Sequence, residues 1–188
     1  KTDRVYVFFL IFIILIQASK SQLAFDYDSL WYGLRPEYVL VTSKSFYENM
    51  GLLQFVHYYP KFMEILFLPL SGNGDYSFIY LGNVCIFIML LKYTNIFMNH
   101  FKILGKNKLV LSLLIFSIPT ISNFASTAKT DLITVFIMIF VLDNILLFYK
   151  KYKYEYFILS IIGILIATTL KGTSLIYMPF ILVSILLV

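Results

Sequence analysis

Residues Leu132–Tyr149 read LITVFIMIFVLDNILLFY, and this apolar run decides the class of fold. A helix needs about 20 predominantly apolar residues to cross the ~30 Å hydrocarbon core of a bilayer. Asp131 precedes the run and Lys150 follows it, so a charged residue marks each end. We therefore predict a membrane-spanning helix here, and similar runs lie on both sides of it.

The composition of the whole chain favours the same class. Hydrophobic residues make up 60% of the sequence, charged residues make up 13%, and the mean hydropathy is +0.85. So few charges cannot build an ordinary soluble surface. We predict an all-α polytopic membrane protein with about six transmembrane helices. The candidate spans are Val5–Ala18, Tyr76–Met98, Leu109–Ala125, Leu132–Tyr149, Tyr156–Leu170 and Ser174–Val188.

Residues 1–188 are expected to form a single transmembrane domain. The chain begins at Lys1 rather than Met and stops at Val188 inside an apolar stretch, so we expect a fragment of a longer protein. No clean small-residue cleavage site follows Val5–Ala18, which favours an uncleaved first helix over a signal peptide.

The lysine-rich connections predict the orientation of the spans. Cytoplasmic connections carry an excess of Lys and Arg. With six spans, all the basic clusters fall on one side: Lys1 and Arg4, then Lys102, Lys106 and Lys108, then Lys150, Lys151 and Lys153. Residues 19–75, the turn 126–131 and residues 171–173 then face the non-cytoplasmic side. We predict a multi-pass protein of the plasma membrane whose active face is non-cytoplasmic.

The connection over residues 19–75 is too long for a plain linker, because loops beyond about 15 residues are usually functional or disordered. Apolar and polar side chains alternate by face in Ser45–Val56, as in a helix lying along the membrane interface. Pro60 can open a second short helix, Lys61–Leu68, since proline suits the first helical turn. We predict two short interfacial helices in this external loop.

Three motifs carry a resemblance to a known family. An acid follows the first span in Asp28-Ser29-Leu30-Trp31-Tyr32, the pair Tyr59-Pro60 introduces an interfacial helix, and Ala125–Asp131 opens the fourth span. This arrangement resembles the GT-C class of membrane glycosyltransferases. The branch it is most similar to contains dolichyl-phosphate-mannose protein mannosyltransferases and bacterial lipopolysaccharide glycosyltransferases. Many members carry Asp-Glu where this chain has Asp28-Ser29.

The resemblance implies transfer of a sugar from a polyprenyl-phosphate carrier to a lipid, glycan or protein acceptor in the envelope. In that reaction Asp28 would deprotonate the acceptor hydroxyl, and Asp131 would position the acceptor or a metal. A divalent cation is compatible with the family, but the metal ligands stay unknown. The remaining substrate-binding candidates, aromatic and basic, are Tyr32, Arg35, Tyr59, Lys129 and Lys171.

Basic residues on the predicted external face are candidates for holding the carrier phosphate. Arg35 can form a bidentate fork on phosphate oxygens, whereas Lys61, Lys129 and Lys171 would act as point charges. Lys171 begins Lys171-Gly172-Thr173 and resembles a basic position in these transferases.

Simpler roles exist for several of these residues. Asp28 could cap a helix or form a surface salt bridge, and Asp131 could be the N-cap of the fourth span. Lys129 could anchor a helix end at the interface, because lysines near span ends extend to the headgroups. For Asp143 we expect hydrogen bonding between helices rather than a proton relay.

Proteins of other functional classes can also carry charged residues in an apolar helix bundle. A transporter or flippase also places charges in a helix bundle, but typically through broken helices in inverted halves. A purely structural membrane subunit would have no need for acids and bases gathered on one side. Nucleic-acid binding is not expected, because the basic residues are dispersed over short connections rather than clustered on one polar surface.

Overall fold

The computed structural model describes residues 2–20, 33–34, 60–71, 77–103, 105–179 and 183, and all elements within them are helical. The α-helices are α1 (Thr2–Ser19), α4 (Phe62–Phe67), α5 (Ser77–Phe97), α6 (Gly105–Phe116), α7 (Pro119–Phe124), α8 (Asp131–Lys151) and α9 (Tyr154–Leu170). Three 3-10 helices accompany them: η3 (Leu68–Leu70), η4 (Met98–Phe101) and η5 (Gly172–Tyr177).

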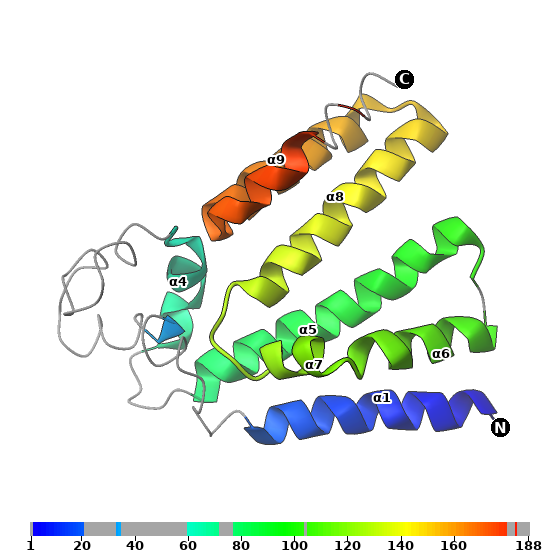
Figure 1. Ribbon diagram of the computed structural model, residues 1–188, viewed down its shortest axis with the longest axis vertical. Helices are drawn as coiled ribbons and strands as arrows, with labels where there is room; N and C mark the ends of the chain where they lie inside the picture. The colour runs from blue at the N-terminus through cyan, green and yellow to red at the C-terminus, as the bar shows by residue number, and fades with distance from the viewer. Residues whose placement is uncertain are drawn as a thin grey trace.

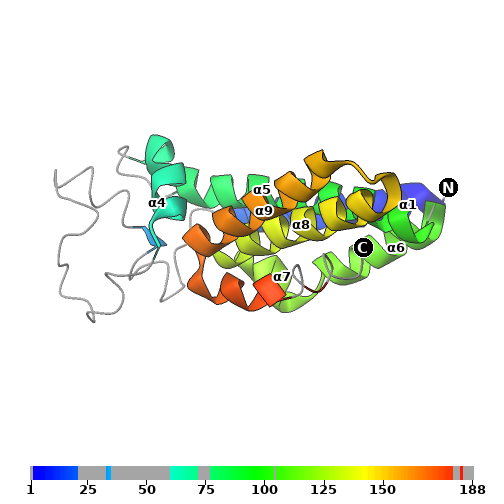
Figure 2. The ribbon, with the colours of Figure 1, turned by 90° about the horizontal axis from the view of Figure 1, so that it is seen from above.

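The long helices form a bundle with two distinct ends (Figures 1 and 2). Helices α1, α5 and α6 pack together, α8 and α9 form an antiparallel hairpin, and α5 joins the two groups by packing on α8. One end, called the loop end below, carries α4, the start of α8 and the end of α9. The other, called the lysine end, carries the α5–α6 and α8–α9 connections with Lys102, Lys106, Lys150 and Lys153.

Two of the described helices are long and apolar enough to cross a membrane: Ser77–Phe101, which is α5 with η4, and Asp131–Lys151, which is α8. With 21 residues α8 is about 31 Å long at 1.5 Å per residue, which matches a ~30 Å hydrocarbon core. Helices α1 and α9 are apolar but shorter. The all-helical class is therefore confirmed. The prediction of six spans is not supported, because two of the described helices are long and apolar enough to cross a membrane.

The predicted third span, Leu109–Ala125, is not one helix. Helix α6 ends at Phe116, and a separate short helix, α7, begins at Pro119. Proline has no N–H to donate, and it disfavours the helical conformation in the residue before it. Ile118 accordingly adopts ψ 124°, which ends the regular hydrogen-bonding pattern.

A short helix is present where the helix Lys61–Leu68 was predicted, with its boundaries shifted. Helix α4 covers Phe62–Phe67 and continues into η3, which contains Pro69. Both views place α4 at the loop end, lying across the bundle rather than along it (Figures 1 and 2). The other predicted interfacial helix, Ser45–Val56, lies outside the described residues. Of the predicted last span, the described part begins with η5 rather than with a long helix.

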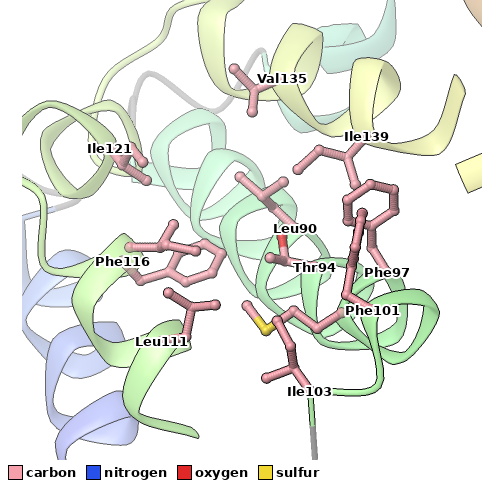
Figure 3. Close-up of a pocket in the computed structure, with 12 residues that line it drawn as sticks. Leu90, Thr94, Phe97, Phe101, Ile103, Leu111, Phe116, Ile121, Val135 and Ile139 are labelled. Carbon is pink, nitrogen blue, oxygen red and sulfur yellow. The ribbon is translucent and has the colours of Figure 1, made fainter. Parts of the chain in front are cut away.

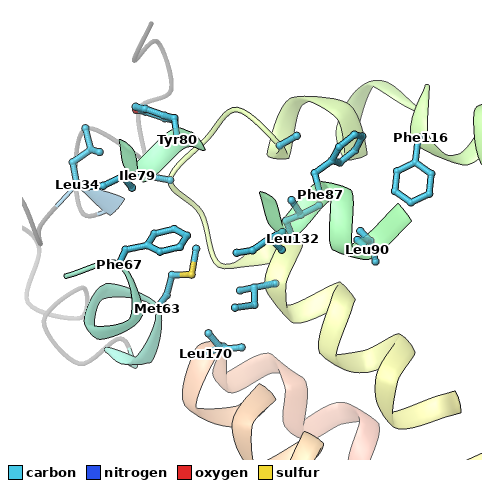
Figure 4. Packing of buried hydrophobic residues seen from close by; sticks show 14 residues of the cluster. Leu34, Met63, Phe67, Ile79, Tyr80, Phe87, Leu90, Phe116, Leu132 and Leu170 are labelled. Atoms are coloured by element: carbon cyan, nitrogen blue, oxygen red, sulfur yellow. The ribbon is translucent and has the colours of Figure 1, made fainter. Parts of the chain in front are cut away.

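A buried apolar cluster joins these elements at the loop end (Figure 4). Phe87 of α5 and Phe116 of α6 meet edge to face with ring centroids 5.2 Å apart, and both side chains are buried. Met63 and Phe67 attach α4 to this cluster, and Leu34 attaches the first loop. The cluster also contains Leu132 and Leu170, so it fixes the two helix ends that flank the site described below.

Large apolar side chains also cover the outer surface of the bundle. Exposed examples on four helices are Phe8 (63%), Met89 (52%), Val135 (46%) and Leu165 (54%). Soluble monomers rarely expose large apolar surfaces, because these would be in contact with water. This surface agrees with the apolar composition and with contact to lipid.

A tight turn sets the register of the α8–α9 hairpin. Tyr152 has φ 53°, and its N–H donates to the carbonyl oxygen of Phe148, 2.7 Å away. The left-handed region is unfavourable for residues with a Cβ, and glycine is the preferred residue at this kind of helix end. Farther along the hairpin, Gly163 of α9 lies so close to α8 that an added Cβ would come within 2.6 Å of Val141 Cγ2.

We predict that Tyr152→Gly stabilises the protein. The Tyr152 side chain is 69% exposed and contributes little packing, while glycine removes the left-handed penalty. The expected gain is ~0.5–1 kcal/mol, measured as a rise in the thermal unfolding midpoint of detergent-solubilised protein. Tyr152→Ala is the control, since it removes the same ring but keeps the Cβ. An equal rise for both variants would contradict the explanation.

Candidate functional site

A cavity of about 520 Å³ lies at the loop end, where four separate segments meet. This loop-end cavity falls within the range of roughly 300–1,000 Å³ typical of small-molecule sites. Its lining comes from the first loop, from α4, from the turn before α8 and from the end of α9. The lining residues are Gly33, Pro60, Met63, Glu64, Ala128, Thr130, Leu170, Lys171, Gly172 and Thr173.

An ion pair between two predicted site residues lies at the edge of this cavity. Lys171 Nζ contacts Asp131 Oδ1, and the two side chains are 40% and 27% exposed. Asp131 is the first residue of α8, and Lys171 follows directly after the last residue of α9. These positions are electrostatically favourable, because a helix N-terminus attracts negative charge and a C-terminus attracts positive charge.

The geometry rules out the simpler role considered for Asp131. The N-cap of α8 is Thr130, so Asp131 is inside the helix and its carboxylate is directed to Lys171 instead. Lys171 has an extended backbone with φ −152°, which ends α9 and starts the Gly172–Tyr177 segment. The two charged groups are therefore brought together by the ends of neighbouring antiparallel helices.

The turn before α8 is held in place from two sides. The buried Asn83 amide on α5 donates a hydrogen bond to the carbonyl oxygen of Thr127. From the first loop, Gly33 lies against Ala128 so closely that a Cβ would overlap the Ala128 carbonyl oxygen. The turn is thus clamped between α5 and the first loop, and Gly33 is the residue type that this approach requires.

A second ion pair, in α4, forms another part of the site. Lys61 Nζ lies 3.6 Å from Glu64 Oε1, and both side chains are more than nine-tenths buried. Glu64 lines the loop-end cavity, but sequence reasoning did not select it. The spacing could have identified Glu64, because an acid three residues after Lys61 in a short helix is placed to pair with that lysine.

The structure brings some of the predicted site residues together and not others. Lys171 lines the loop-end cavity and Asp131 pairs with it. Lys129 is not among the lining residues; its ammonium lies over the Phe124 ring, 5.8 Å from the centroid. Asp28, Tyr32, Arg35 and Tyr59 lie outside the described residues.

A second polar cluster occupies the lysine end. The buried Asp143 carboxylate accepts a hydrogen bond from Tyr93 Oη at 2.8 Å and lies 2.6 Å from His100 Nε2. Lys150 Nζ is 3.0 Å from His100 Nδ1. Since an ammonium can only donate, Nδ1 accepts and Nε2 carries the proton that faces Asp143. The expected interhelical hydrogen bonding of Asp143 is confirmed, linking α8 to α5 and η4.

The described residues do not form a site for a divalent cation. No group of three or more His, Cys, Asp or Glu side chains in the described ranges could hold a metal ion. Each carboxylate nearest the loop-end cavity already has a lysine partner: Asp131 pairs with Lys171, and Glu64 pairs with Lys61.

Comparison of the chain with protein-family models, with curated proteins and with solved structures finds no match in any of the three. A half-exposed ammonium at a cavity edge can bind an anion such as a phosphate. Nearby carboxylates can hold that ammonium in position or accept hydroxyl protons.

We predict energetic coupling between Asp131 and Lys171. Asp131→Asn and Lys171→Met should each lower the unfolding midpoint, and the double variant should lose less than the sum. Because the pair is partly exposed, the expected coupling is ~0.5–1 kcal/mol, measured by a double-mutant cycle.

The matched control for this cycle is Lys151→Met combined with Asp131→Asn. Lys151 lies at the lysine end, where it contacts Tyr156 and not Asp131, so these two effects should add. If the effects of the Asp131 and Lys171 substitutions are fully additive, their contact does not contribute to the free energy of unfolding.

Proposed function

We propose that this chain is part of a membrane glycosyltransferase that moves a sugar from a polyprenyl-phosphate carrier to an acceptor. The observation that carries the proposal is the loop-end cavity, where the Lys171–Asp131 pair meets the first loop at Gly33. These are the segments that the resemblance to GT-C enzymes identifies as functional. Lys171 and Asp131 are 40 residues apart in sequence, so their contact is independent of the motifs that first suggested them.

In the proposed reaction, a carboxylate accepts the proton of the acceptor hydroxyl. The acceptor oxygen then attacks the anomeric carbon with inversion, the bond from that carbon to the phosphate oxygen breaks, and the electron pair leaves with the phosphate. We assign the base to Asp28. It precedes Gly33 by five residues, and five residues span at most about 18 Å, so a role at the same cavity is compatible with the chain length.

Lys171 is proposed to hold the carrier phosphate. Its ammonium is at the cavity edge and would stabilise the negative charge that develops as the phosphate leaves. Asp131 would then act as a positioning residue, since it fixes the lysine side chain without needing to touch the sugar. Such an arrangement supplies a cation that is ordered before the donor binds.

The proposal includes a multi-pass arrangement with the loop end on the non-cytoplasmic side of the plasma membrane. Two apolar helices of spanning length support it, as does the exposed apolar surface of α1 and α9. The lysine-rich connections lie at the opposite end from α4, as the positive-inside rule requires for this orientation.

The activity test uses the full-length protein in membranes with a polyprenyl-phosphate sugar as donor. Asp28→Asn should lower turnover by ~100-fold or more while donor binding persists, because general base catalysis contributes 10²–10⁴. Lys171→Met should chiefly raise the KM for the donor, since the phosphate loses its counter-charge. Sugar transfer is measured as labelled acceptor formed per minute.

Matched controls separate these effects from general damage. Asp26→Asn removes a carboxylate two residues from Asp28, and Lys151→Met removes a lysine at the other end of the bundle; both should retain activity. Unchanged transfer in Asp28→Asn would refute the assignment of the base. Carrier movement across sealed vesicles without any sugar transfer would instead favour the alternative, a transporter or flippase.

The orientation is tested by cysteine labelling in intact cells. In a Cys85→Ser background, Ser126→Cys at the loop end should react with an impermeant maleimide, whereas Lys106→Cys at the lysine end should react only after the membrane is opened. The reverse pattern would show the opposite orientation. Equal labelling of both sites would show that they do not lie on opposite sides of a membrane.

A further inference from the structure

A second cavity, unrelated to the loop-end cavity, lies between α5, α6, α7 and α8 and has a volume of about 320 Å³ (Figure 3). Its walls are aliphatic and aromatic, and Thr94 is the one lining residue with a polar side-chain group. None of its lining residues lines the loop-end cavity. It is called the lysine-end cavity here, because residues from η4 and the following turn form part of its wall.

The lysine-end cavity reaches from the buried interior to the outer surface. Phe116 and Leu90 at its inner side are 1% and 2% exposed, whereas Phe101 and Val135 are 58% and 46% exposed. An apolar cavity that opens on an apolar surface does not attract water. In a bilayer it would be filled by hydrocarbon.

One lining side chain, Thr94, carries a polar group. The Thr94 side chain is 7% exposed, and its Oγ1 is covered by neighbouring atoms and has no hydrogen-bond partner in the described part of the chain. The accessible wall of the cavity is therefore apolar, which suits an acyl chain.

The charges around the outer rim point to the sign of the headgroup. Lys102 lies between the lining residues Phe101 and Ile103, and Lys106 and Lys108 are in the first turn of α6, which supplies lining residues farther along. Lys102 and Lys106 are exposed, and Lys108 is partly exposed and donates a hydrogen bond to Asn99 Oδ1. No Asp or Glu occurs between Asp75 and Asp131 in the sequence, so this segment is uniformly basic.

We propose that the lysine-end cavity binds an anionic phospholipid of the surrounding membrane. One acyl chain occupies the apolar cavity, and the phosphate lies among Lys102, Lys106 and Lys108. The inference rests on the proposed membrane embedding but not on glycosyl transfer.

Lipid binding is tested on the purified full-length protein in zwitterionic detergent. Phosphatidylglycerol and phosphatidylcholine with identical acyl chains are titrated separately, with bound lipid counted by native mass spectrometry and the unfolding midpoint followed in parallel. Phosphatidylglycerol should bind more tightly and raise the midpoint more. Equal binding of the two lipids would overturn the proposal.

Two variants locate the site. Replacing Lys102, Lys106 and Lys108 by Gln should weaken phosphatidylglycerol binding, by about fivefold for each lysine removed, and leave phosphatidylcholine binding unchanged. Leu111→Trp should fill the cavity and abolish binding of both. The control is Lys20→Gln, which removes a lysine after the last residue of α1 and should bind as the wild type does.

Two other outcomes would each overturn a part of the proposal. If Leu111→Trp binds phosphatidylglycerol normally while the lysine variant does not, the lipid lies on the surface and not in the cavity. If Leu111→Trp changes the oligomeric state rather than lipid binding, a second copy of the chain occupies the cavity. Loss of sugar transfer with normal lipid binding would leave this inference intact, so the two proposals fail separately.

Discussion

The register of the α8–α9 hairpin is the constraint on which the loop end depends. Antiparallel helices joined by a short turn bring together residues at equal distances from it. Val141 and Gly163 are 11 residues on either side of Tyr152, and the two helices are in close contact there. Asp131 and Lys171 lie 21 and 19 residues from the same turn, so they meet at the far ends of the hairpin. A change of register would separate the ion pair and alter the wall of the loop-end cavity.

The polar groups of this apolar bundle are concentrated at its two ends. Asn83, Asp131 and Lys171 lie at the loop end, whereas Tyr93, His100 and Asp143 lie at the lysine end. An ionised side chain in an apolar environment is stable only when it is paired or hydrogen-bonded, and both clusters meet this requirement internally. The difference between them is exposure: Asp143 is buried, while the Asp131–Lys171 pair is open to a cavity. An open pair can exchange partners with a ligand, which makes the loop end the better candidate for chemistry.

Local properties of the sequence predicted the helices well. Apolar length alone located α1, α5, α8 and α9, because hydropathy is a sum over neighbouring residues and needs no knowledge of the fold. The same sum joined α6 and α7 into one span, since averaging over an apolar window does not register the missing N–H of Pro119. At the start of the predicted last span, the chain from Gly172 to Tyr177 forms a 3-10 helix, and most of the rest of that span lies outside the described residues.

The sequence by itself determined the helical, apolar class of this protein, and the alternation of lysine-rich connections placed Asp131 and Lys171 at the same end of the bundle. Only the tertiary structure decided that these two side chains touch, that Glu64 and Gly33 line the same cavity, and that Asp143 binds Tyr93 and His100. The three side-chain contacts join residues 40 to 50 positions apart. They depend on the rotation of each helix about its axis and on the register between helices, which are set by packing at sites such as Gly163 and by turns such as Tyr152 rather than by local composition.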